Sequence, residues 1–97
     1  MFKYWSIKKY GSKLLPQLEK HYGENTFYTA SQIRTIVYKK DFNPSYLPLG
    51  YILFLDPARL DGVLAKEFPE VKVNEYKKEI LTFLEEKSYN GFLLTLQ

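Results

Sequence analysis

The single histidine, His21, is the first candidate for catalytic chemistry, because histidine is the side chain that titrates near neutral pH. A hydrolytic triad would also need a serine nucleophile and a carboxylate beside the histidine. Glu19 lies two residues before His21 and therefore faces a different side of a helix. None of the serines follows the pattern of a nucleophile elbow. We therefore expect a protein that is not an enzyme, with His21 on the surface near a helix end.

Metal, phosphate and cofactor chemistry has no better support in the sequence. The chain has no cysteine, no HExxH, no GxxxxGK and no GxGxxG pattern. The adjacent carboxylates Glu85 and Glu86 fit a solvated helix face. We expect no catalytic, cofactor-binding or metal-binding residues and no cofactor. The absence of cysteine suits a reducing cytoplasm, which is the localisation we expect.

Basic residues are concentrated in the first part of the chain, which suggests an anionic partner as one hypothesis. Residues 1–55 hold eight bases against three acids, a net charge of +5, whereas residues 56–97 hold six bases against eight acids, a net charge of −2. Clustered positive charge is enough for weak, sequence-nonspecific binding of nucleic acid. The residues for this alternative are Lys9, Lys13, Lys20, Arg34, Lys39 and Lys40. The simpler interpretation is a solvated lysine face opposite the core.

Protein–protein interaction is the function that we favour, through Phe2, Trp5, Lys8 and Lys9. Phe2 and Trp5 fall near the lysine side of the first helical segment, away from its apolar stripe. An exposed tryptophan is enriched in interface hot spots. The alternatives are that both rings cover the core or that the N-terminus frays. A membrane-surface helix would retain only these two rings for lipid once the core takes the apolar stripe.

Residues 2–22 predict a helical segment, since apolar positions recur at steps of three and four. The shared face consists of Tyr4, Ile7, Gly11, Leu14, Leu15, Leu18 and Tyr22. Pro16 lacks an N–H and must either kink this helix or start a second one, with Gly11 as the stop of the first piece. Gly23 then ends the segment.

Helix-capping residues divide the middle of the chain. Thr29 with Gln32 predicts a capping box that opens a helix to about Lys40. Ser45 is the expected cap of a third helix, residues 46–55, which is apolar nearly all round and is therefore expected to be the buried centre. A strand over residues 51–55 is the alternative, weakened by Pro48.

Two further helices follow. Asp56 before Pro57 predicts an N-cap. The buried stripe of that fourth helix is expected to be Leu60, Val63, Leu64 and Phe68. Residues 71–73 are expected to be extended, and Asn74 is expected to cap the last helix. The core side of the last helix is expected to hold Tyr76, Ile80, Phe83, Leu84 and the stem of Lys87, with a stop at Asn90 and Gly91.

The sequence thus predicts an all-α fold, a small single domain over residues 1–97 with four to five short helices packed around residues 46–55. The uncharged apolar tail, residues 91–97, is expected either to dock on the core or to remain flexible. Its residues 92–96 are a second candidate contact. The partner is expected to be another protein, and no transmembrane segment is expected, because the longest apolar run is too short to span a bilayer.

A family resemblance rests on several caps, turns and core positions. They are Lys13-Leu14-x-Pro16 with Leu18, Tyr22-Gly23, Tyr28-Thr29 with Gln32, and Asn43-Pro44-x-Tyr46 before an apolar helix. Over roughly residues 7–80 the chain resembles an uncharacterised family of small bacterial proteins. The resemblance implies a helical fold in a bacterial cytoplasm and no assigned activity, and the two ends of the chain depart from it.

Overall fold

A computed structural model describes residues 3–86, which form five α-helices and one short 3₁₀ helix and contain no strand. The order is α1 (Tyr4–Tyr22), α2 (Ala30–Lys39), η1 (Pro44–Tyr46), α3 (Leu47–Phe54), α4 (Pro57–Glu67) and α5 (Val73–Glu86). The predicted all-α class is confirmed. Lys87, the Asn90-Gly91 stop and the apolar tail lie outside the described residues.

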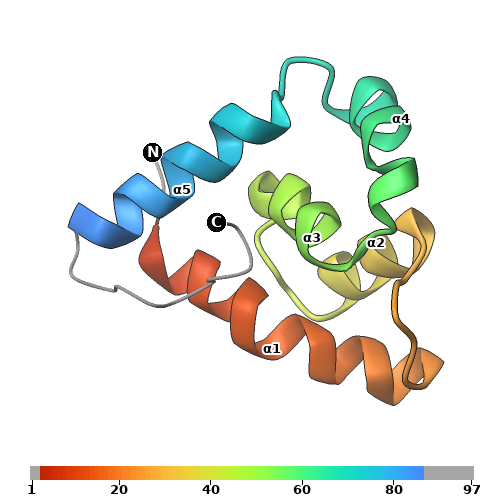
Figure 1. Cartoon of the computed structure of the whole chain (residues 1–97). Helices are drawn as coiled ribbons and strands as arrows, with labels where there is room; N and C mark the ends of the chain where they lie inside the picture. The colour runs from red at the N-terminus through yellow and green to blue at the C-terminus, as the bar shows by residue number, and fades with distance from the viewer. Residues whose placement is uncertain (1–2, 87–97) are drawn as a thin grey trace.

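Helix α3 lies at the centre of the arrangement, and the other helices surround it (Figure 1). It contacts α1, α2 and α4. Its first five residues are buried, and Ile52, Leu53 and Phe54 are half-buried against the core. The prediction of a central apolar helix is therefore confirmed, and the strand alternative for residues 51–55 is wrong.

Each surrounding helix contributes one apolar stripe to the same core. The fully or nearly fully buried side chains of these helices are Ile7, Tyr10, Leu14, Leu18, Ile33, Ile36, Val37, Leu60, Leu64, Ile80 and Leu84. On α4 and α5 the predicted Val63, Phe68, Tyr76 and Phe83 are half-buried and pack against this core. The N-terminal stripe needs one correction. Leu15 is 36% exposed, while Tyr10, which the periodicity did not single out, is completely buried.

Tyr10 takes this place because the fold satisfies both parts of its side chain. Its hydroxyl donates to the carbonyl oxygen of Asn43 at 2.7 Å. Its ring packs edge-on against Phe42 and at a tilt against Tyr46. A buried tyrosine whose hydroxyl is hydrogen-bonded contributes a large apolar area without an unsatisfied polar group.

Helix α1 continues through Pro16 as a single element, so Pro16 does not split it and Gly11 does not stop it (Figure 1). Pro16 lies on the solvent side of the helix. Proline has no N–H to donate to the carbonyl group of Ser12. That carbonyl group lies on the solvent side, where water can donate to it instead. Gly23, with φ +82°, ends the helix as expected.

Of the four predicted N-cap residues, two cap a helix as expected and two do not. The Thr29–Gln32 capping box is present, and Asp56 caps α4 by accepting from the backbone N–H of Ala58. Ser45 is not a cap. Instead, the Asn43 carboxamide oxygen accepts from the Ser45 N–H at 3.0 Å and starts η1. Asn74 lies inside α5, which begins at Val73.

Gly50 marks the closest approach of α3 to its neighbours. A Cβ atom at this position would lie 3.2 Å from Tyr10, 3.3 Å from Ile33 and 3.3 Å from Leu14. These side chains come from α1 and α2, so the absence of a side chain lets α3 contact both helices at once. Gly62 on α4 has no such neighbour, because a Cβ there would meet nothing within 4 Å.

We expect Gly50→Val to lower the free energy of unfolding by about 2 kcal/mol, because branched methyl groups would overpack this crossing. Gly62→Ala is the matched control and should raise it by about 0.5–1 kcal/mol through helix propensity alone. Urea denaturation followed by circular dichroism measures both. Equal small effects at the two glycines would show that α3 does not pack this closely.

Candidate functional site

Trp5 lies in the first turn of α1 and is 74% exposed, which makes it the most exposed large hydrophobic residue of the described chain. On a helix with 3.6 residues per turn it lies almost opposite the buried residues Ile7 and Leu14. The ring of Tyr4 touches it at a centroid distance of 5.7 Å. Trp5 is therefore at the centre of the outer face of α1.

Lys8 lies one turn further along the same outer face. It is exposed, and its Nζ atom lies 5.3 Å from the centroid of the Trp5 ring, which is a cation–π distance. The structure thus brings together two of the four residues predicted for protein interaction. Phe2 lies outside the described residues.

Lys9, the fourth predicted residue, is directed toward the interior contacts of the fold. Its Nζ donates to the carbonyl oxygens of Lys40 at 3.2 Å and Asp41 at 3.0 Å. It also lies 4.6 Å from the centroid of the Phe42 ring. The ammonium group of Lys9 thus lies at the C-terminal end of α2. There it satisfies free carbonyl groups and opposes the negative end of the helix dipole. Lys9 therefore joins α1 to the turn after α2.

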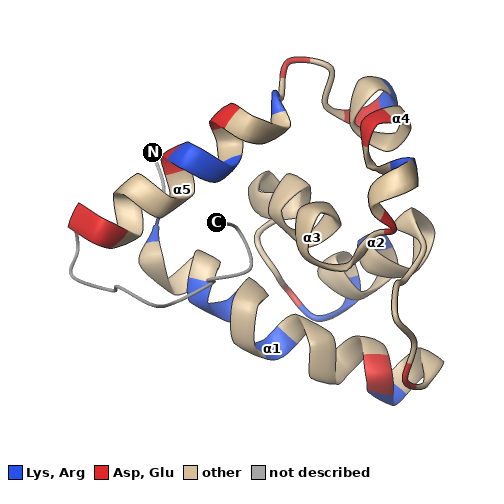
Figure 2. Cartoon of the chain, viewed as in Figure 1, with Lys and Arg blue, Asp and Glu red and all other residues tan. Residues whose placement is uncertain are grey.

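The six residues of the nucleic-acid alternative do not form one free cluster. Lys9 is engaged as described, and Arg34 forms an ion pair with Glu67. Lys13, Lys20 and Lys39 are exposed, and Lys40 is half-buried. Figure 2 shows basic residues along α1 and at the end of α2, with acidic residues more frequent on α4 and α5.

His21 is exposed at the end of α1, beside the ring of Tyr22. Partial desolvation, followed by the positive charges of Lys39, Lys40 and Lys20, lowers its pKa. The charged groups that act on this histidine are therefore cations.

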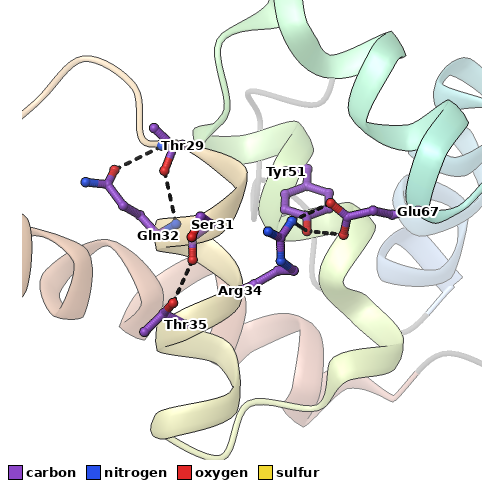
Figure 3. Close-up of polar contacts among 7 residues, drawn as sticks. All are labelled: Thr29, Ser31, Gln32, Arg34, Thr35, Tyr51 and Glu67. Atoms are coloured by element: carbon purple, nitrogen blue, oxygen red, sulfur yellow. Dashed lines mark hydrogen bonds and ion pairs between the residues drawn. The ribbon is translucent and has the colours of Figure 1, made fainter.

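A polar network that the sequence did not reveal joins α2, α3 and α4 (Figure 3). Arg34 Nη1 donates to a carboxylate oxygen of Glu67 and, at 3.3 Å, to the hydroxyl oxygen of Tyr51. The Tyr51 hydroxyl donates to the other Glu67 oxygen at 2.5 Å. Burial, and then the hydrogen bond to Glu67, raise the pKa of Tyr51. The network holds three helices together, and no local sequence signal connects its members.

One groove, with a volume of about 560 Å³, lies between the start of α2 and α4. Phe27, which is 44% exposed, Leu55 and Val63 supply much of its apolar lining. Its charged residues, Asp56 and Arg59, have opposite signs. The lining therefore favours neither an anionic nor a cationic ligand.

Within residues 3–86 there is no group of three or more His, Cys, Asp or Glu side chains that could hold a metal ion. No helix in this part of the chain is both long and apolar enough to cross a membrane.

Comparison with known proteins gives a family and no activity. Residues 1–94 match a family of unknown function, DUF6559, and the chain belongs to this family. The predicted resemblance to an uncharacterised family is thereby confirmed, and the match extends beyond residues 7–80 to the start of the chain and to residue 94. The chain matches none of the curated proteins and none of the solved structures with which it was compared.

The two adjacent lysines provide a direct test of their different positions. We expect Lys9→Met to lower the free energy of unfolding by about 1 kcal/mol, because two carbonyl groups lose a charged donor. Lys8→Met, which removes only an exposed ammonium group, should change it by less than about 0.5 kcal/mol. Thermal unfolding should show a lower melting temperature for the first variant alone. Equal melting temperatures would contradict the structural role of Lys9.

Proposed function

We propose that this protein is a non-enzymatic interaction module that binds another protein through the outer face of α1. The contact is centred on Trp5 and includes Lys8. The observation that carries the proposal is the 74% exposure of the Trp5 side chain. The remaining elements serve to hold α1 in the orientation that presents this ring to solvent.

Trp5 has the properties of an interface anchor. Tryptophan has a large, rigid side chain that gains a large contact area with little loss of conformational entropy. Residues of this type dominate binding energy when they become fully desolvated in a complex. Its ring is not needed for the core, because Ile7, Leu14 and Leu18 fill the inner side of α1. Packing of the core therefore does not explain why a tryptophan occupies position 5.

The surroundings of His21 support the non-enzymatic part of the proposal. This side chain lies at an exposed helix end, and partial desolvation followed by the neighbouring cations lowers its pKa. A general base requires both a substrate-binding position and a group that orients it. In the described part of the chain, the groove of about 560 Å³ is lined by residues of α2, α4 and the segments before them, and His21 is not among its lining residues.

Weak binding of nucleic acid is the rival function, and the contacts of Lys9 and Arg34 make it less favoured. Two of its six basic residues already have partners within the fold. Phosphate binding through the remaining lysines would weaken steeply as salt rises. A salt titration with a short duplex and with single-stranded DNA therefore separates the two hypotheses, and tight retention of either DNA would favour the rival.

We expect Trp5→Ala to weaken partner binding by about 30-fold or more, since truncation of a hot-spot residue costs about 2 kcal/mol or more. Its free energy of unfolding should change by less than about 0.5 kcal/mol, because the ring is exposed. Tyr38→Ala is the matched control, since Tyr38 is an aromatic residue of α2 that is 63% exposed. Affinity capture from cells that produce the protein, compared across the three proteins, measures the effect.

Two outcomes would contradict the proposal. Equal recovery of the same proteins by the wild type and by Trp5→Ala would show that Trp5 is not a contact. A parallel loss of helicity and of binding in Trp5→Ala would show that this side chain supports the fold instead.

A further inference from the structure

We propose that the surface docking on this face is an acidic peptide segment in which carboxylates flank an apolar side chain. This inference rests on the proposed function, since it specifies the chemistry of the partner at the same site. The apolar side chain would pack on the Trp5 ring. The carboxylates would lie against Lys8 on one side of the ring and against Lys13 on the other.

The charge on this part of α1 has a single sign. Residues 3–18 contain Lys3, Lys8, Lys9 and Lys13 and no acidic residue, and the first acid is Glu19. In the described part of the chain, the ion pair between Arg34 and Glu67 is the only salt bridge. The positive charges around Trp5 are therefore not neutralised by carboxylates of residues 3–86. A partner that supplies those carboxylates would complete the charge pairing.

The start of α1 also departs from the rules that stabilise helices. Its N-cap residue, Lys3, makes no side-chain capping bond, and its first turn contains no acid. Positive side chains near the N-terminal end of a helix are unfavourable, because that end carries the positive end of the helix dipole. Such local conflicts are expected at functional sites. An acidic partner would remove this conflict, because its negative charge would interact favourably with the lysines and with the positive end of the helix dipole.

The available lysines surround Trp5 rather than lying apart from it. At about 100° per residue, Lys8 lies about 60° to one side of Trp5 and Lys13 about 80° to the other. Both lysines are exposed, as is Lys3. Lys9, which lies between Trp5 and Lys13 on the helix, is directed to the carbonyl groups after α2 and does not compete for the partner. Figure 2 shows that basic residues recur along the first part of α1.

A protein segment fits this face better than an anionic membrane or a nucleic acid. Stable binding of a helix to lipid requires a broad apolar face. The outer face of α1 offers Trp5 and, at its edge, Leu15, which is only 36% exposed. Strong phosphate binding requires many free bases, and this face has two exposed lysines, Lys8 and Lys13. One anchor residue with a few charges around it is instead the usual composition of a small protein interface.

Trp5 is the only tryptophan of the chain, so its fluorescence reports this site directly. The probe is a short, tryptophan-free synthetic peptide of Glu and Leu with an amphipathic pattern. We expect it to shift the emission of Trp5 to shorter wavelength, and the same peptide with Gln in place of Glu to bind about tenfold or more weakly. Vesicles containing phosphatidylserine and single-stranded DNA are titrated in the same way.

Charge-reversal variants test whether the lysines are the cause. We expect Lys8→Glu combined with Lys13→Glu to weaken binding of the acidic peptide about tenfold. Lys66→Glu combined with Lys78→Glu is the matched control, because both residues are exposed on other helices, and it should change binding less than about twofold. Circular dichroism confirms that each variant is folded before its binding is compared.

Several results would overturn the inference. These are equal binding of the Glu and Gln peptides, no emission change with the acidic peptide, equal effects of the two double variants, or tighter binding of vesicles or DNA. Capture of the partner by these variants tests the proposed function and the acidic nature of the partner separately. If Trp5→Ala loses the partner and the Lys8 and Lys13 double variant retains it, the proposed function stands and the acidic partner is wrong. If Trp5→Ala retains the partner, the proposed function itself fails.

Discussion

The close packing of α3 against α1 and α2 at Gly50 is the constraint on which the remaining structure depends. Without a side chain at this position, α3 lies within van der Waals distance of Tyr10, Leu14 and Ile33. Such a crossing buries the most apolar helix of the chain and fixes the helices around it, because interiors packed at this density do not deform easily. Lys9 and the Arg34–Tyr51–Glu67 network then join neighbouring elements around the same centre.

The orientation of α1 follows from this packing. Once Ile7, Tyr10 and Leu14 face α3 and its neighbours, Trp5 must face the opposite direction, since a rigid helix has only one face for the core. The same geometry assigns different roles to two adjacent lysines. Lys9 reaches the carbonyl groups after α2, and Lys8 remains beside Trp5 in solvent. The proposed contact surface is therefore a consequence of how the core is built.

Local sequence signals predicted much of the fold, because α2 and α4 begin at residues that cap them. The start of α2 was predictable from Thr29 with Gln32, and the start of α4 from Asp56 before Pro57. In both cases the capping side chain lies only a few residues from the group it caps. Other features depend on residues distant in sequence. Asn43 displaced Ser45 as a cap, the carbonyl of Asn43 made burial of Tyr10 favourable, and Arg34 meets Glu67 across 33 residues. Trp5 and Lys8 were predictable as a surface pair because they share one helix, whereas the role of Lys9 required knowledge of where α2 ends.

Quenching of Trp5 fluorescence in the native protein by iodide and by caesium tests the central claim most directly. The structure predicts that iodide reaches the ring nearly as well in the folded protein as in the unfolded chain, because the side chain is 74% exposed. It also predicts stronger quenching by iodide than by caesium, because Lys8 and Lys13 attract anions and repel cations. A short-wavelength emission that neither ion quenches would place Trp5 in the core and contradict the account.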